Sequence, residues 1–248
     1  MTYSLLLRSL DSKPTREELE EISVHVPSIA KADCRYLLDD WFGVVVSHVD
    51  SETARLFQAA LKQKGYETDQ VADGDIPALH GDFRCQRLSI DKESILFSDA
   101  MGRNHQRYRS DLVFAAAGAI EKNRMVSDWE VELETRFTGD GAYTVPINKR
   151  TYNFEKKAYF RFDFFFTSSP NRLSLELAAD NVIFYMDRPV RMRDSLDLKI
   201  LMVDIQALLP PERMNQSLRN LSIDSVYPSM KAYEEELRWA FYRLGAKA

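Results

Sequence analysis

Five arginines in two groups are the residues of this sequence best suited to bind an anionic ligand. Arg103, Arg107 and Arg109 are separated by two or four positions, and Arg191 and Arg193 follow later in the chain. Alternate residues of a strand share a face, and the guanidinium fork binds a phosphate with two parallel hydrogen bonds. These arginines are therefore candidate ligand-binding residues for a lipid headgroup or a phosphopeptide. The alternative is a solvated face whose arginines pair with nearby carboxylates.

Residues in patterns typical of catalysis or metal binding are scarce. The histidines form no HExxH or HxH spacing, and Cys34 and Cys85 belong to no CxxC pair. His80 lies five positions before Cys85, but a nucleophile and its base must meet in space with a third orienting group. A cysteine within a strand is more often a small buried residue. With no phosphate-binding glycine loop or GxSxG motif, we predict no catalytic residue, no metal and no cofactor, and two free thiols.

The elements of the first 73 residues follow the order β-α-α-β-α-β. Thr15 and Glu18 form a capping-box pattern at the start of one helix, and Asp50 or Ser51 is the expected cap of another. Gly65 is a typical helix stop. Apolar helix faces need a sheet to cover, so the pattern predicts a small open-faced α/β sandwich.

This order of elements, with the strand Gly65-Tyr66-Glu67-Thr68 after the last helix, resembles the C-terminal domain of the bacterial ribosomal stalk protein. It also resembles the Clp protease adaptor that shares this fold. In both, the domain docks other proteins and performs no chemistry. The resemblance implies a docking-type domain over residues 1–73.

A polar stretch with two glycines and a proline, residues 73–82, is the expected linker. A β-rich domain is predicted over residues 82–248. Its strands are expected at the following ranges: 83–90, 94–99, 105–109, 112–120, 129–134, 159–167, 172–178 and 182–186. The alanines of 112–120 leave a helix as the alternative for that range. The strand at 129–134 alternates apolar and acidic residues, which indicates one acidic solvated face. Residues 138–155 are interpreted as a long excursion.

Two helices are predicted at the C-terminal end. The first starts at Asp194-Ser195, and Leu196, Ile200, Val203 and Leu208 can share one of its faces. About seven antiparallel strands closed by a C-terminal helix resemble the pleckstrin-homology superfold, and the turn at Gly102-Arg103 is similar to bacterial members of it. The resemblance implies a pleckstrin-homology-like β barrel, and the whole chain is assigned to the α+β class.

Composition narrows the classes of function. Hydrophobic residues make up 45% of the 248 residues, enough for a sizeable core, and the net charge of −5 disfavours nucleic-acid binding. The sequence shows no export signal and no run of roughly 20 apolar residues. We therefore expect a cytoplasmic protein without a membrane span, whose contact with lipid would be peripheral.

Three functional hypotheses remain open. The leading one is a non-enzymatic protein-interaction or scaffolding protein, because both resemblances are to binding folds. The second is an enzyme whose site assembles only in three dimensions, which a deep pocket with two or more perturbed titratable groups would favour. The third is a sensor of anionic lipid or phosphopeptide that uses the five arginines.

Overall fold

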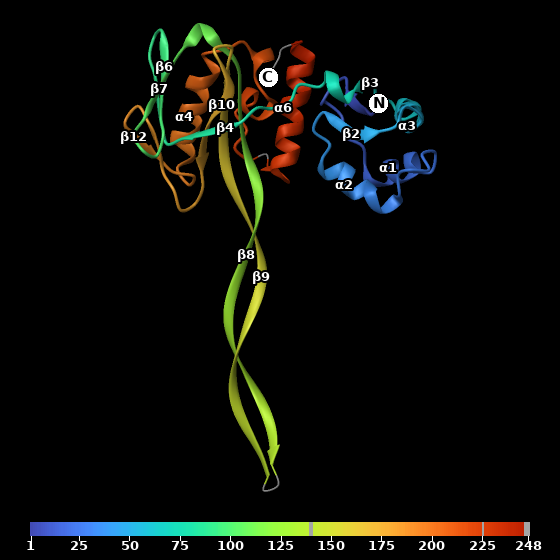
Figure 1. Cartoon of the computed structure of the whole chain (residues 1–248), viewed down its shortest axis with the longest axis vertical. Coiled ribbons are helices and arrows are strands. Elements are labelled where there is room, and N and C mark those ends of the chain that lie inside the picture. Colours follow the sequence, from blue (N-terminus) through green and yellow to red (C-terminus); the bar gives the residue numbers. More distant parts are fainter. Residues whose placement is uncertain (139–140, 225, 246–248) are drawn as a thin grey trace.

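The computed structural model describes residues 1–138, 141–224 and 226–245. It contains helices and three β-sheets, so the predicted α+β class is confirmed. A compact head carries the described helices, and one long two-stranded ribbon projects from it (Figure 1). No helix in the described part of the chain is long and apolar enough to cross a membrane.

The first part of the chain has the predicted order of elements. They are β1 (Tyr3–Leu7), α1 (Arg16–Ser23), α2 (Cys34–Asp39), β2 (Val44–Val49), α3 (Ser51–Gln63) and β3 (Thr68–Ala72). The strands form an antiparallel sheet of order β2-β1-β3. The capping box is confirmed, because the Glu18 backbone N–H donates to the Thr15 hydroxyl and the Thr15 N–H donates to the Glu18 carboxylate. Asp50 caps α3 by accepting from the N–H groups of Glu52 and Thr53.

The second part contributes most of the strands. Among the described residues they are β4 (Asp82–Cys85), β5 (Arg87–Ile90), β6 (Ser94–Ser98), β7 (Asn104–Tyr108), β8 (Leu112–Thr138), β9 (Gly141–Phe166), β10 (Ser169–Leu177), β11 (Ile183–Tyr185), β12 (Arg188–Val190) and β13 (Val226–Tyr227). The helices are α4 (Ser195–Gln206), α5 (Gln216–Arg219) and α6 (Met230–Leu244). Single 3-10 turns lie at Lys31–Asp33, Asp73–Asp75, Arg109–Asp111 and Pro211–Arg213. The expected linker, residues 73–82, begins with the second of these turns and leads into β4.

The expected barrel is not closed. The described strands form two separate five-stranded sheets, of order β13-β8-β9-β10-β4 and β12-β11-β5-β6-β7. Three pairs, β4 with β10, β5 with β11 and β8 with β13, are parallel rather than antiparallel. The first of these sheets ends in the edge strands β13 and β4 and the second in β12 and β7, so neither closes on itself.

The phenylalanines at the head end of β9, from Phe160 onward, form the core that the sequence predicts for this segment. Phe160, Phe162 and Phe164 point to one side and pack with α4 and the second five-stranded sheet. Phe165 points to the other side and packs on Phe241 of α6. The first five-stranded sheet is therefore covered on both faces, which fixes the root of the ribbon between two apolar layers.

The predicted excursion at residues 138–155 is wrong for the residues that the structure describes. Residues 141–155 belong to β9 and pair with β8 in continuous antiparallel register, from Thr138 opposite Gly141 to Arg124 opposite Glu155. This part of β9 could not be predicted from the sequence, because it leaves the head and packs on no core. Its residues therefore show no alternation of buried apolar and exposed polar positions.

Three of the four residues predicted for one face of the first C-terminal helix point outward, and the fourth, Leu208, lies beyond the helix and packs on the core. Leu196, Ile200 and Val203 of α4 are exposed, whereas the helix buries its opposite side: Leu198, Leu201, Met202 and Ile205. Apolar residues of α4 lie on both of its sides. Their spacing alone therefore could not show which side faces the core.

Candidate functional site

The five candidate arginines lie at two opposite edges of one sheet. Arg107 belongs to β7, with Arg103 and Arg109 just before and after this strand, and Arg191 and Arg193 follow β12. In the order β12-β11-β5-β6-β7, the edge strands are roughly 20 Å apart at about 4.8 Å per strand. The structure does not bring the two groups into one site, and anionic-ligand binding by either group stays a prediction.

Partners within the protein occupy the group around β7. The Arg103 Nε lies 2.6 Å from an Asp99 carboxylate oxygen. The Arg107 guanidinium donates to its neighbouring backbone carbonyl at Gln106, and Arg109 donates to the carbonyl of Lys92. Of these three contacts, that of Arg103 is the pairing with a carboxylate described by the alternative of a solvated face, and those of Arg107 and Arg109 are to backbone carbonyls.

The cysteines are not placed for nucleophilic chemistry. Cys34 and Cys85 are buried free thiols. Burial raises the pKa of the Cys85 thiol to about 12, so the thiolate is scarce at neutral pH. Within the described ranges, no group of three or more histidine, cysteine or acidic residues could hold a metal ion.

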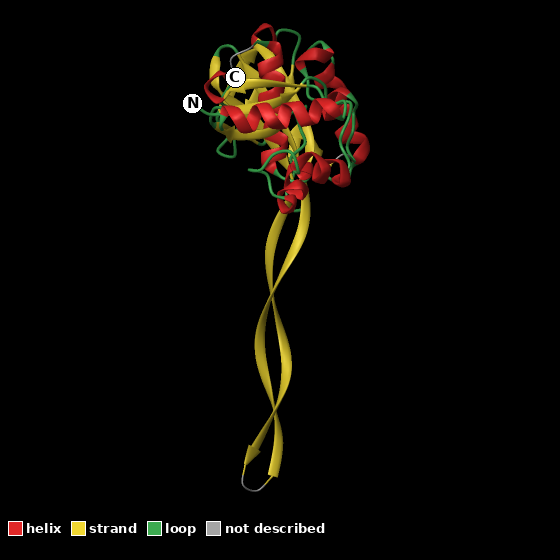
Figure 2. Ribbon diagram, turned by 90° about the vertical axis from the view of Figure 1, so that its right-hand side faces the viewer, coloured by secondary structure: helices red, strands yellow, loops and turns green. Residues whose placement is uncertain are grey.

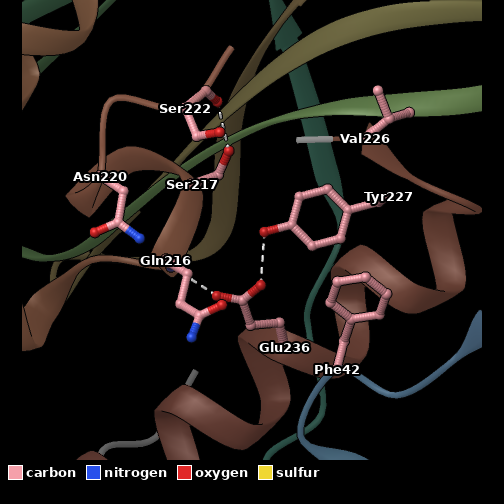
Figure 3. A pocket seen from close by; sticks show the side chains of 8 residues that line it. All are labelled: Phe42, Gln216, Ser217, Asn220, Ser222, Val226, Tyr227 and Glu236. Carbon is pink, nitrogen blue, oxygen red and sulfur yellow. Dashed lines mark hydrogen bonds between the residues drawn. The ribbon is translucent and has the colours of Figure 1, made fainter. Parts of the chain in front are cut away.

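A small pocket beside α6 contains a buried carboxyl–phenol pair (Figure 3). The Tyr227 hydroxyl donates a 2.6 Å hydrogen bond to Glu236, which also accepts from the backbone N–H of Gln216. Asn215 donates to the Tyr227 oxygen. Burial raises the pKa of both Tyr227 and Glu236. The pocket has a volume of about 160 Å³, below the roughly 300 Å³ at which small-molecule sites begin.

A buried cluster of charges lies at the root of the ribbon. Arg161 of β9 is 1% exposed and lies 2.8–2.9 Å from three carboxylates, those of Asp82, Asp163 and Glu176. Glu176 also pairs at 2.9 Å with Arg84 at the surface. Because each carboxylate comes from a different strand, this cluster ties β4, β9 and β10 together where the ribbon leaves the sheet.

The ribbon beyond this root is the largest feature without a covering layer. Its segments 121–138 and 141–158, which we call the arm, pair only with each other among the described residues. At about 3.3 Å per residue they extend on the order of 55 Å. The arm twists and stands clear of the head in both views (Figures 1 and 2).

The described part of the arm has two unlike faces. Opposite residues of an antiparallel pair share a face, so Leu133 and its partner Pro146 lie on the same side as Val131 and Tyr152. We call these four residues the apolar stripe; Asn148 and Arg150 share this face, and the Arg150 guanidinium lies over the Tyr152 ring. Val131, Leu133 and Tyr152 are 65%, 68% and 54% exposed, so the stripe meets solvent. The other face carries charge, including a 3.0 Å ion pair between Glu132 and Lys149.

The two long edges of the arm also differ. Prolines in strands are confined to edges because they have no N–H, and Pro146 belongs to β9. β8 contains no proline between residues 121 and 138. Its outer edge, beyond the short contact with β13 at Ala119 and Ile120, is a row of backbone groups without a strand partner in the described structure.

Sequence reasoning found only half of this site. It predicted the strand at 129–134 with its acidic solvated face but missed β9 as its partner. One signal was available: the residues from Glu121 to Ala158 include seven acidic and seven basic residues, a balance that suits an exposed paired ribbon.

Comparisons with known proteins give no match: no family model, no curated protein and no solved structure is similar to this chain.

Proposed function

We propose that this is a non-enzymatic protein-interaction or scaffolding protein, and that the arm docks a partner protein. The observation that carries the proposal is the length of the arm without any covering layer. An isolated two-stranded ribbon is marginally stable in water, and sheets of three or more strands with a covered apolar face are the stable form. A partner that supplies a strand and covers the apolar stripe would complete the arm.

The charge of the arm favours a protein over a nucleic acid. The two segments of the arm contain six acidic and seven basic residues, so their charges nearly cancel, and the whole chain carries −5. Nucleic-acid binding draws its affinity from basic surfaces that neutralise phosphates. The arm offers no such excess.

The proposed occupant is an extended segment of another protein that adds to the outer edge of β8. Such strand addition derives affinity from backbone hydrogen bonds and specificity from alternate side chains. Glu132 and Glu134 lie on the charged face of β8, where Glu132 already pairs with Lys149 of β9, and a partner strand that alternates basic and apolar residues would add a second cation beside these carboxylates. A second copy of β8 fits less well, because an antiparallel pair centred on Leu133 would set Glu132 of one copy opposite Glu134 of the other.

A peptide experiment tests this proposal. The probe is a labelled peptide of about ten residues that alternates valine and lysine, and the control peptide alternates valine and glutamate. A shortened chain, in which Asn-Gly replaces residues 127–152 between the paired positions Val126 and Asn153, provides the protein control.

We expect the valine–lysine peptide to bind the intact chain at least about tenfold more tightly than it binds the shortened chain. The control peptide should bind the intact chain more weakly by a similar factor. The valine–lysine peptide should also protect backbone amides of residues 129–138 from hydrogen exchange. Equal binding of both peptides, or equal binding to the shortened chain, would overturn the proposal.

The pocket of Tyr227 and Glu236 is the observation that favours the second candidate, an enzyme. It contains two titratable groups with raised pKa, which is typical of active sites. We rank this candidate lower because the pocket is small and internal partners already occupy both groups.

A further inference from the structure

Helix α4 is apolar on both sides, although only one side packs on the head. Its outward side exposes Leu196, Ile200 and Val203 by 71%, 46% and 48%, and Ala207 just after the helix is also exposed. A helix at the surface of a head normally turns one apolar side inward and a polar side to solvent, so a second, exposed apolar side is unusual. We call these four residues the α4 stripe, and its exposure indicates a surface that another molecule covers.

The spacing of the α4 stripe matches a helix-pairing seam. Intervals of four, three and four residues place Leu196 and Val203 at d positions and Ile200 and Ala207 at a positions of a heptad. Ile200 at a and Leu196 at d follow the pattern that favours a two-stranded pairing, whereas Val203 at d and Ala207 at a do not. The geometry therefore suits one further helix that packs side by side with α4.

The charges beside the α4 stripe are complementary to those of a second α4. Lys199 occupies a g position and Asp204 the e position that follows, and these two positions meet across a parallel helix pair. An antiparallel pair would instead bring the e positions together and set Asp197 near Asp204 of the other helix. A 2.6 Å hydrogen bond from the Tyr185 hydroxyl holds the Asp204 carboxylate in place beside the stripe.

We propose that the α4 stripe is where a second copy of this chain docks, with the two α4 helices parallel about a twofold axis. Such an interface is isologous, so each Lys199 faces the Asp204 of the other copy and the arrangement closes as a dimer. Two twelve-residue helices bury less than the roughly 1,000 Å² of a stable interface, so the dimer should be weak, with a Kd in the micromolar range. This inference uses a surface separate from the arm and does not depend on the proposed function.

Sedimentation equilibrium tests the dimer. The intact chain should pass from monomer to dimer between about 1 µM and about 200 µM. Ile200→Glu should weaken association at least about thirtyfold, because it places a carboxylate in the seam. Met101→Glu is the matched control, since Met101 is an exposed apolar residue in another part of the head, and it should dimerise like the parent chain.

Engineered cysteines test the parallel orientation. In a parallel pair, Val203 of one copy faces Val203 of the other, so Val203→Cys should form a disulfide-linked dimer under mild oxidation. Met101→Cys should not, and the native cysteines do not interfere because both are buried. The reversal Lys199→Asp should weaken the dimer, and combining it with Asp204→Lys should restore at least part of the loss.

Two outcomes would overturn the inference. One is a chain that stays monomeric up to about 200 µM. The other is a dimer whose association constant is unchanged by Ile200→Glu. If that dimer dissociates when the arm is shortened, the arm is the self-association surface instead. The chain shortened at residues 127–152 should still dimerise through α4, so failure here is distinct from failure of the peptide experiment.

Discussion

The indole N–H of Trp239 donates a 2.6 Å hydrogen bond to the backbone carbonyl oxygen of Leu7. This contact joins the last helix to the first strand of the chain. The guanidinium of Arg243 donates to the same carbonyl at 2.6 Å and pairs with Asp69 of β3 at 2.9 Å. The first part of the chain is thus held against α6, so the expected linker is not its only connection to the rest of the molecule.

Gly43 is the position at which this contact is most sensitive to substitution. Its φ is +101°, and a Cβ placed there would lie 2.5 Å from Cβ and Cγ of Trp239. We expect Gly43→Ala to lower the free energy of unfolding by about 3 kcal/mol, from backbone strain together with displacement of Trp239. Urea unfolding followed by tryptophan fluorescence measures the change.

Gly65→Ala is the matched control for Gly43→Ala. Gly65 also has a positive φ, +88°, but a Cβ placed there would have no atom within 4 Å beyond its chain neighbours. The substitution should cost only the backbone strain of about 1 kcal/mol. Equal losses from the two variants would contradict the role given to the contact with Trp239.

Arg161→Lys tests the buried charge cluster at the root of the arm. A lysine has one ammonium group and no fork, so it cannot reach all three carboxylates that Arg161 contacts. We expect a loss of about 3 kcal/mol, because the fully buried Asp163 loses its two-point contact with the guanidinium. Chemical denaturation gives the value.

Arg84→Lys is the control for this cluster. Arg84 shares the partner Glu176, but its side chain is 67% exposed. Its replacement should change the free energy of unfolding by no more than about 0.5 kcal/mol. A comparable loss from both variants would show that burial of Arg161 is not the cause.

The raised pKa of the buried Glu235 carboxyl predicts that the free energy of unfolding depends on pH. This residue of α6 is 7% exposed, and burial raises its pKa from 4.5 to about 7 despite the nearby Lys231. The folded chain therefore holds a proton that the unfolded chain releases between about pH 4.5 and 7. Stability from this group is fully present below about pH 4.5 and is lost as the pH rises, by roughly 3 kcal/mol in total.

Glu235→Gln should remove this loss, since an amide does not titrate. Relative to the parent chain, the variant should gain roughly 3 kcal/mol between about pH 4.5 and 8. Denaturation at several pH values measures the difference. An exposed control, Glu212→Gln, should stay within about 0.5 kcal/mol of the parent, and a pH-independent difference for Glu235→Gln would refute the assignment.

Local chemistry explains which elements the sequence could predict. The caps at Thr15 and Asp50 and the buried strand with Phe160, Phe162 and Phe164 depend on neighbouring residues, and their patterns are visible in the sequence. The second strand of the arm was missed because pairing with β8, and not burial of apolar side chains, makes this segment a strand. The cluster around Arg161 was missed because its carboxylates come from three strands without a common spacing.

Photo-crosslinking in the native cell tests whether the arm docks a partner protein. A photoreactive residue replaces Leu133, which is 68% exposed on the arm, or Tyr108, which is 64% exposed on the edge strand β7. We predict a discrete adduct of higher mass at position 133, absent at position 108 and competed by the valine–lysine peptide. The same adducts at both positions, or none at position 133, would contradict the account.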